Sequence, residues 1–547
     1  MTSLLVATSL AFVTLALALD SSVAVETSSE DNGHFAVASL APAESVLTSS
    51  SGSRVNIDTG ILEGALLHDG SAVLAFKGIP YADSPAGAWR WKPPRPAAAW
   101  RGVRTAREFG PICPQTDRDV ENFRRLTIAM GGDPAWVPPL GLVSEDCLSL
   151  NVFTTQLEGS RPVMVWLHGG SNAFGSGGDE AAALAPYGAV VVTVNYRLGL
   201  LGFLAHPALS KESPHDASGN YGLLDQIAAL QWVQRNIAAF GGDPHRVTLF
   251  GHSAGGDSVA QLLASPLTHG LFHRAIIQSG GLGESRSRVD MEAEGMKIAN
   301  QLAVPADNPL PALRKLSIEK LLGASNGPFD AMADGWVLAP APKRGALVTG
   351  NAGDIPLLIG ATENEAAIFN LGDRQRSNTV AAFRELVESA DTDSAHQERL
   401  FAAYPTKTES EVTAATVQFM TDLYFVCPAR YVAARRKAPT WLFRFTATPT
   451  PAANGTSLGA FHGADVRLLF DQTYGVRQNP SEQRVGEAMR RYWVAFAATG
   501  NPNVSDLPAW QAFREPHPQA LELGDTIRSV PSGVSASCRV LDEIWDR

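Results

Sequence analysis

The chain has 547 residues, of which 45% are hydrophobic and 18% are charged, and it carries a formal net charge of −11 at pH 7. This composition is typical of a soluble globular protein with a large core. The acidic balance argues against a nucleic-acid-binding surface, so we expect no nucleic-acid partner.

Residues 1–24 predict a secretory signal peptide. An uncharged apolar run extends from Leu4 to Leu19, which is short for a membrane span, and small residues near its end offer cleavage sites. No Lys or Arg precedes Arg54, so the usual basic start is missing, and an uncleaved anchor is the alternative. Residues 25–53, rich in Ser, Ala, Thr and Glu, predict a flexible tether. We therefore expect a secreted or periplasmic protein without a membrane span in its mature chain.

Strand and helix patterns alternate along the rest of the chain. Apolar runs rich in β-branched residues predict strands at 162–170, 188–197, 246–251 and 355–361. The segment 221–242 has apolar residues at three-and-four spacing and a glycine stop, which predicts a helix. Such alternation predicts an α/β fold whose mostly parallel sheet is covered by helices on both faces. The mostly helical regions 285–345 and 374–437 are expected to be insertions that cap this sheet.

The stretch VTLFGHSAGGDS, residues 247–258, surrounds one serine with small residues. An apolar run ends at Gly251, Ser253 follows two residues later, and a helix-compatible run comes next. A strand that turns sharply into a helix needs tiny neighbours at the crowded corner, and it pushes the serine oxygen outward. This context predicts Ser253 as a nucleophile, and a glycine-rich turn without chemistry is the alternative.

A serine hydroxyl needs an adjacent base near neutral pH, and after this kind of turn the chain order is serine, acid, histidine. His462 is the candidate base in GAFHGADVRLLF, where it follows small residues and precedes Asp465. For the acid, IPLLIGATENEAAIF places Glu363 and Glu365 just past an apolar strand. Spacing alone does not choose between them. A structural histidine and surface glutamates are the alternatives.

The glycine-rich segment WLHGGSNAFGSG, residues 166–177, follows another apolar strand. Backbone N–H groups of such a loop can hold the oxyanion of a tetrahedral intermediate, and each donor is typically worth ~3 kcal/mol. A phosphate-binding loop is the alternative, but no Gly-Lys-Ser/Thr follows. We therefore expect no nucleotide and no other cofactor.

The chain contains four cysteines, Cys113, Cys147, Cys427 and Cys538. An even number in an exported chain predicts two disulfides, and spacing leaves three pairings open. No Cys-x-x-Cys or Cys/His cluster supports a metal site. His269 and His273 are four residues apart but lack the glutamate of a metalloprotease motif, so we expect no metal.

Motifs spread over residues 54–547 match one family in order. They include FKGIPYA (76–82), SEDCLSLNV (144–152), NYRLGLLGFL (195–204), FGGDPHRVTLFGHSAGG (240–256), GLFHRAIIQSGG (270–281) and GAFHGADVRLLF (459–470). On these residues the chain resembles the type-B carboxylesterases, which also contain the cholinesterases and many microbial esterases. The resemblance implies an α/β-hydrolase fold over residues 54–547, with the helical insertions capping an active-site gorge.

The resemblance also implies roles for individual residues. Ser253 would be the nucleophile, His462 the base and Glu365 the acid, because Gly360 to Glu365 match the family's Gly-x-x-x-x-Glu segment. Further residues that it implies are the oxyanion-hole donors (N–H groups of Gly170, Ser171 and Ala254), a serine behind the acid (Ser279), buried ion pairs (Arg90–Glu145 and Arg197–Asp225) and disulfides (Cys113–Cys147 and Cys427–Cys538). From their places beside Ser253 and His462 in the chain, we also expect His252 and Asp465 to lie behind the triad.

The sequence departs from the family pattern around the site. His252 stands where the family usually has glutamate, Ser171 replaces the third glycine of the oxyanion loop, and Ala366 replaces the glycine after the acid. Asn172 replaces the usual aromatic residue after that loop. A positive φ at Ser171 would cost ~1 kcal/mol, but its N–H remains. None of these changes removes a catalytic group.

These residues predict a serine carboxylic-ester hydrolase that acts through an acyl-enzyme on a small-molecule ester. An interfacial lipase is the runner-up, and a non-catalytic cholinesterase-like binding protein is the alternative from another class. Stretches such as 202–225 resemble microbial branches that include para-nitrobenzyl esterases and fumonisin esterases. Substrate identity stays open, because variable loops decide specificity. The oligomeric state also stays open.

Overall fold

The structure is a computed structural model that describes residues 53–546 except 68–70, 138, 179–180, 283–285, 325–328, 340–346, 349–353, 371–378, 450–456 and 474–475. The predicted signal peptide at 1–24 and all but the last residue of the predicted tether at 25–53 lie outside the described residues.

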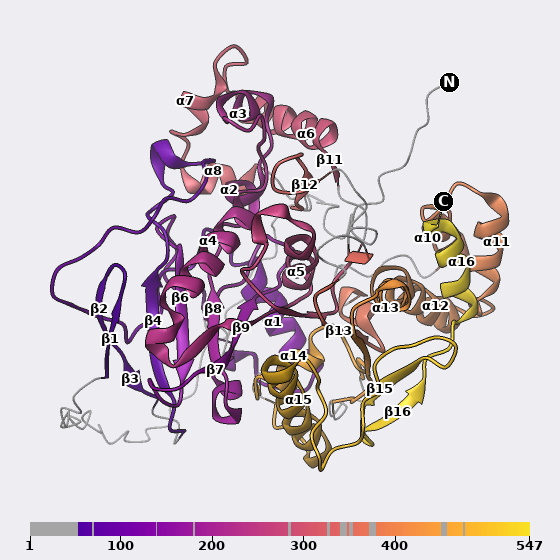
Figure 1. Ribbon diagram of the computed structural model, residues 1–547. Coiled ribbons are helices and arrows are strands. Elements are labelled where there is room, and N and C mark those ends of the chain that lie inside the picture. Colours follow the sequence, from indigo (N-terminus) through magenta and orange to yellow (C-terminus); the bar gives the residue numbers. More distant parts are fainter. Residues whose placement is uncertain are drawn as a thin grey trace, which may run out of the picture.

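A large mixed sheet runs through the described part of the chain (Figure 1). Its strands, in spatial order, are β16 (Arg528–Pro531), β15 (Gln519–Leu523), β14 (Thr440–Phe445), β13 (Leu357–Thr362), β10 (Arg274–Gln278), β9 (Gly242–His252), β7 (Arg161–Leu167), β8 (Val190–Val194), β6 (Ser149–Thr154), β4 (Leu74–Pro80) and β3 (Ala65–Leu66). The strands from β15 to β8 pair in parallel, and the strands at both edges pair antiparallel. All four predicted strands belong to the parallel block, so the prediction of a mostly parallel sheet is confirmed.

The residues of β7 show why the sheet is covered on both faces. Val163 and Val165 pack into one hydrophobic core, whereas Met164 and Trp166 pack into another. Successive side chains of a strand point to opposite faces, so a strand buried on both faces needs apolar residues at every position. The continuous apolar run predicted as a strand is therefore the signature of a sheet between two helical layers.

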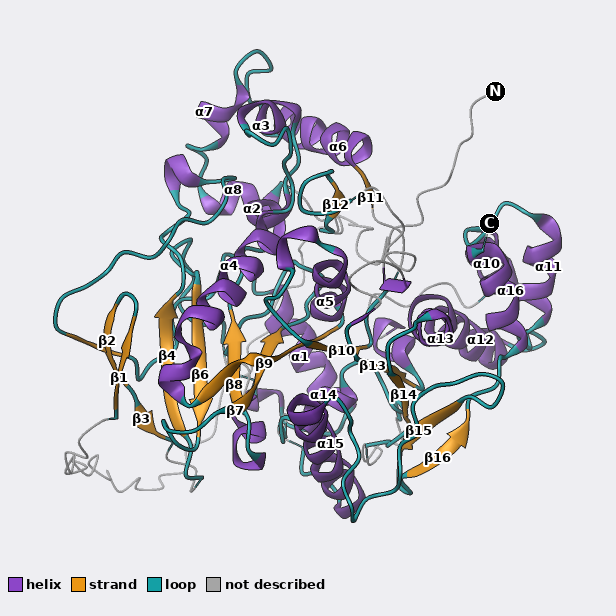
Figure 2. Cartoon of the chain, in the orientation of Figure 1, coloured by secondary structure: helices purple, strands orange, loops and turns teal. Residues whose placement is uncertain are grey.

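Helices supply both layers (Figure 2). They are α1 (Arg118–Ala129), α2 (Gly199–Phe203), α3 (Pro207–Glu212), α4 (Tyr221–Asn236), α5 (Ala254–Ala264), α6 (Arg288–Gln301), α7 (Pro309–Leu313), α8 (Ile318–Gly323), α10 (Val380–Glu388), α11 (Ser394–Ala402), α12 (Glu409–Thr421), α13 (Cys427–Arg435), α14 (Ala464–Leu469), α15 (Pro480–Thr499) and α16 (Ala536–Trp545). Helices α4 and α5 share the core of Val163, and α14 and α15 share the core of Trp166. The architecture is the α/β-hydrolase fold that the resemblance implies.

The helix predicted at 221–242 is confirmed with an earlier end. The α-helical part stops at Asn236, and a 3₁₀ turn over Ile237–Phe240 completes it. Gly241 then takes a left-handed conformation with φ 75°, which ends the helix because glycine reaches this region at little cost.

Both predicted insertions are helical in their described residues. The first contains α6, α7 and α8, at the top of Figure 1, together with the short parallel pair β11 (Arg286–Ser287) and β12 (Met332–Ala333). The second contains α10 to α13 on the right of Figure 1, beside the C-terminal helix α16. β1 (Arg54–Ile57), β2 (Gly60–Glu63) and β5 (Val103–Thr105) form a small separate sheet.

The structure contains the two disulfides that the resemblance implies, Cys113–Cys147 and Cys427–Cys538. It also contains both ion pairs. Arg90 Nη2 lies 2.6 Å from Glu145 Oε1, and Arg197 Nη2 lies 2.7 Å from Asp225 Oδ1. Within the described residues, no helix is long and apolar enough to cross a membrane, and no His, Cys, Asp and Glu side chains group as metal ligands would.

Candidate active site

Ser253 lies at the sharp corner between β9 and α5. Its backbone has φ 55° and ψ −126°, an unusual conformation for a residue other than glycine. A Cβ added to Gly251 would lie 2.5 Å from the Gly255 carbonyl, and one added to Gly255 would lie 2.0 Å from the Leu167 carbonyl oxygen. The small residues are therefore required by space, because helix α5 begins directly against strand β7. This is the strand–serine–helix turn that the sequence predicted.

His462 and Glu365 form a short, buried hydrogen bond. His462 Nδ1 lies 2.5 Å from Glu365 Oε2, and the other carboxylate oxygen, Oε1, accepts a hydrogen bond of 2.7 Å from the Thr362 N–H. The Glu365 side chain is fully buried, and the His462 side chain is 8% exposed. Because a carboxylate accepts the bond at Nδ1, the imidazole carries a proton on that nitrogen and presents a lone pair at Nε2.

A small backbone bridge brings these two residues together from distant parts of the chain. Asn364, at the carboxyl end of β13, pairs with Phe461 in a parallel bridge. The Asn364 N–H donates to the Ala460 carbonyl over 2.9 Å, and the Ala460 N–H donates to Asn364 Oδ1 over 3.0 Å. The residues that follow Asn364 and Phe461, namely Glu365 and His462, are therefore held side by side.

Glu363, the other carboxylate that the sequence left open, points elsewhere. Its side chain is 37% exposed and forms an ion pair with Arg444, which is itself half exposed. Glu363 directly follows β13, whereas Glu365 begins a 3₁₀ helix over Glu365–Asn370, so the chain turns between the two carboxylates and they point in different directions. The structure brings Glu365 to the histidine.

Three rings surround the His462 imidazole. The centroid of the His252 ring lies 4.4 Å from that of His462, the Phe425 centroid 5.2 Å, and the Phe369 centroid 5.4 Å. Phe425 belongs to a π-helical turn, Asp422–Val426, that joins α12 to α13 in the second insertion. Such turns recur at functional sites. Neither phenylalanine was predicted, since an aromatic residue in a helical region carries no pattern that separates it from a core residue.

The residues expected behind the triad have different surroundings. Burial chiefly, and then the neighbouring His462, lowers the pKa of His252 well below its usual value. Asp465 is fully buried and accepts a hydrogen bond of 2.8 Å from Gln278, and burial is the main cause that raises its pKa to about 6. The Ser279 N–H donates to the Gly360 carbonyl over 2.8 Å, while its buried hydroxyl has no hydrogen-bond partner among the described residues.

The predicted oxyanion loop lies against the serine turn. A Cβ added to Gly169 would lie 3.1 Å from the Ser253 Cβ, so the loop backbone passes directly beside the serine. Gly170 has φ 106° and Ser171 has φ 53°, which confirms the expected positive φ at the non-glycine position. Ala254 is the first residue of α5, where a backbone N–H has no partner within the helix.

Buried polar side chains hold this loop in place. Gln115 clamps Gly175, accepting from its N–H over 3.0 Å and donating to its carbonyl over 2.9 Å. The Tyr196 hydroxyl donates to the His168 carbonyl over 2.7 Å, and the two rings stack at 4.4 Å. Asn172 Nδ2 donates to the Phe329 carbonyl over 3.0 Å. Sequence reasoning missed these supports, because their partners are far apart in the chain.

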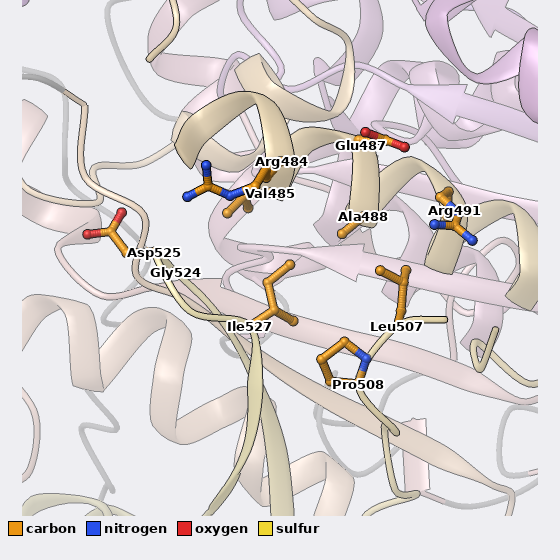
Figure 3. Close-up of a pocket in the computed structure, with 10 residues that line it drawn as sticks. All are labelled: Arg484, Val485, Glu487, Ala488, Arg491, Leu507, Pro508, Gly524, Asp525 and Ile527. Carbon is orange, nitrogen blue, oxygen red and sulfur yellow. The ribbon is translucent and has the colours of Figure 1, made fainter. Parts of the chain in front are cut away.

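A cavity of about 380 Å³ lies elsewhere in the molecule, against α15 (Figure 3). Apolar side chains line it, and charged side chains stand around its rim. None of its lining residues belongs to the serine turn, the Glu365–His462 pair or the oxyanion loop.

The parallel sheet, the strand–serine–helix turn and the buried carboxylate–histidine pair together define an α/β-hydrolase. A family model described as "Carboxylesterase family" matches residues 51–539, so the chain belongs to the carboxylesterase family. It is a carboxylesterase, a hydrolase that acts on carboxylic esters.

Similar proteins support this assignment along most of the chain. A fumonisin B1 esterase of Sphingopyxis macrogoltabida is 36% identical over 469 residues, which cover 81% of this chain and 82% of that protein. A para-nitrobenzyl esterase of Bacillus subtilis (strain 168) is 36% identical over 486 residues, covering 84% and 92%. A solved structure of a PNB esterase superimposes with a TM-score of 0.77 at 31% identity and covers 90% of this chain and 99% of its own.

Proposed function

We propose that Ser253, His462 and Glu365 form a catalytic triad that hydrolyses carboxylic esters through an acyl-enzyme. The observation that carries this proposal is the 2.5 Å hydrogen bond between His462 Nδ1 and the buried Glu365 carboxylate. This bond leaves Nε2 as the basic nitrogen and stabilises the imidazolium that forms when the nitrogen takes a proton. Ser253 stands on the same sheet edge in the conformation of a nucleophile turn.

The reaction begins when His462 Nε2 removes the Ser253 hydroxyl proton and Oγ bonds to the ester carbonyl carbon. The carbonyl oxygen becomes an oxyanion. As this intermediate collapses, the bond to the alcohol oxygen breaks and His462 returns its proton to the leaving alcohol. Water then attacks the acyl-enzyme, His462 takes a proton from it, and that proton passes to Ser253 Oγ as the carboxylic acid leaves.

The oxyanion hole is formed by the backbone N–H groups of Gly170, Ser171 and Ala254. The positive φ values of Gly170 and Ser171 support this role, as does the passage of the loop beside Ser253. Donors on a rigid backbone stabilise the developing charge without reorganising, and each is worth ~3 kcal/mol in the transition state.

The proposed substrate is a small-molecule carboxylic ester. Relatives that are 36% to 34% identical are named for fumonisin B1, para-nitrobenzyl esters and cocaine, so the shared feature is the ester bond rather than one acid or alcohol. We also propose export from the cytoplasm, because both disulfides persist most readily in an oxidising compartment.

Covalent labelling tests the triad. A sulfonyl fluoride should modify a single serine, identified by peptide mass as Ser253, in proportion to the loss of ester hydrolysis. Ser253→Ala should abolish both labelling and nearly all turnover while its thermal unfolding stays close to that of the parent. The exposed Ser389→Ala is the matched control and should keep both.

Other outcomes separate the alternatives. Retained hydrolysis in Ser253→Ala would refute the triad. Neither labelling nor hydrolysis in the parent would instead indicate a non-catalytic binding protein. A jump in rate above the solubility limit of the substrate would identify an interfacial lipase.

A further inference from the structure

His252 occupies an unusual position beside the candidate base. It immediately precedes Ser253 at the end of β9, and its ring packs against the His462 ring with centroids 4.4 Å apart and planes inclined at 42°. The two imidazoles are thus in direct contact.

The surrounding backbone holds the His252 ring in this place. A Cβ added to Gly463 would lie 3.5 Å from His252 Cε1, and one added to Gly169 would lie 3.5 Å from His252 Nδ1. The ring is therefore confined between the oxyanion loop and the loop that carries His462. Its Nε2 atom is buried and has no hydrogen-bond partner within the described residues, so no carboxylate is placed to stabilise a proton there.

We propose that His252 is a positioning residue whose uncharged ring packs against the catalytic imidazole and keeps negative charge away from that side of it. The enzyme therefore stays active at a lower pH than it would with a carboxylate at position 252. The inference rests on the proposed function, because it concerns His462 as the base of the triad. A carboxylate at position 252 would favour the protonated form of His462, which cannot accept the serine proton.

The charged groups around the pair agree with this role. His252 stays uncharged because burial first, and then repulsion by His462, lowers its pKa well below the usual value. His462 is faced by the Glu365 carboxylate and, from α14, by Asp465, whose pKa burial raises to about 6. Phe369 and Phe425 present only uncharged rings. The effects of Glu365 and Asp465 are common to all variants at position 252, so they cancel in a comparison between such variants.

The test compares His252→Glu with His252→Gln in the full chain. An opposite charge within 4–6 Å raises the pKa of a base by about one to three units. The acid limb of the pH profile of kcat/KM, where activity rises with pH, should therefore move to higher pH by about one unit or more in His252→Glu. At a pH on the parent's acid limb, this shift is about a tenfold loss of activity. His252→Gln, similar in size and uncharged, should keep its limb within a few tenths of a unit of the parent.

A second measurement follows the action of His462 as a base without any ester substrate. The rate at which a sulfonyl fluoride inactivates Ser253 should follow the same acid limb in each variant, because the reaction needs unprotonated His462. If either glutamate or glutamine prevents folding, as judged by thermal unfolding, the shorter pair His252→Asp and His252→Asn repeats the comparison.

The possible results are distinct. If the parent is active and labelled but the glutamate and glutamine variants have the same acid limb, the role of His252 is wrong and the triad still stands. An unlabelled and inactive parent would overturn the proposed function itself. A shift in the carboxylate variant alone supports the inference, since a purely structural role would alter both variants alike.

Discussion

Replacing Glu365 with glutamine gives the sharpest test of the buried acid–base pair. Glu365 Oε1 accepts from the Thr362 N–H over 2.7 Å, and Oε2 lies 2.5 Å from His462 Nδ1. In Glu365→Gln the amide oxygen must face the Thr362 N–H, because the opposite orientation would set two donors against each other. The amide NH₂ group then faces His462 and forces Nδ1 to become the acceptor.

This arrangement places the imidazole proton on Nε2, the nitrogen that must take the serine proton. We expect kcat to fall by about a thousand- to ten-thousand-fold, equivalent to about 4–5.5 kcal/mol in the activation barrier. KM should change little, since Glu365 is fully buried and does not reach a substrate. The assay is steady-state hydrolysis of a chromogenic ester at saturating substrate, with thermal unfolding as a check on the fold.

Glu363→Gln is the matched control, two residues away on the same segment. Its carboxylate is partly exposed and pairs with Arg444, and such surface pairs contribute about 0–1 kcal/mol to stability. We expect kcat to remain within about threefold of the parent. If Glu365→Gln keeps a tenth or more of the parent kcat, or if Glu363→Gln loses as much as Glu365→Gln, the assignment of the acid is wrong.

Three further predictions concern the structure that supports the site. Gly255→Ala places a Cβ 2.0 Å from the Leu167 carbonyl oxygen, and this overpacking should cost at least about 3 kcal/mol in the free energy of unfolding, measured by denaturant titration. Asp225→Ala leaves the buried Arg197 guanidinium without its partner and should cost about 3–5 kcal/mol by the same method. Asp465 has a folded-state pKa raised to about 6, so it should lower stability by about 3 kcal/mol as the pH rises from about 4 to 6, and Asp465→Asn should lose this dependence.

Controls for these variants are available on the surface. Gly533→Ala meets no atom within 4 Å and should change stability by about 0.5 kcal/mol or less. Asp58→Ala removes an exposed pair with Arg235 and should cost less than about 1 kcal/mol. If the two controls lose as much free energy of unfolding as Gly255→Ala and Asp225→Ala, then crowding and burial do not cause the losses in those two variants. An unchanged pH slope in Asp465→Asn would assign that slope to another group.

Features that depend on residues close together in the chain could be predicted from the sequence. The serine turn is one, because its small residues all lie within a few positions of Ser253, although part of the crowding that demands them comes from the distant Leu167 carbonyl oxygen. The strands and helices of the two-faced sheet are others, since their periodicity reflects which faces are buried. The oxyanion loop was found in the same way, and its positive φ at Ser171 followed from the residue type that it replaces.

Local sequence patterns could not predict that Glu365 pairs with His462, and only the resemblance to a family selected Glu365 over Glu363. In the structure the choice is made by the turn from β13 into the 3₁₀ helix that begins at Glu365 and by the Asn364–Phe461 bridge, which bring Glu365 to His462 and leave Glu363 partly exposed beside Arg444. The rings of His252 and Phe425 around His462 were likewise invisible as a group. Sequence patterns record which faces of an element are buried, whereas the approach of side chains from distant segments depends on how the strands and insertions pack in three dimensions.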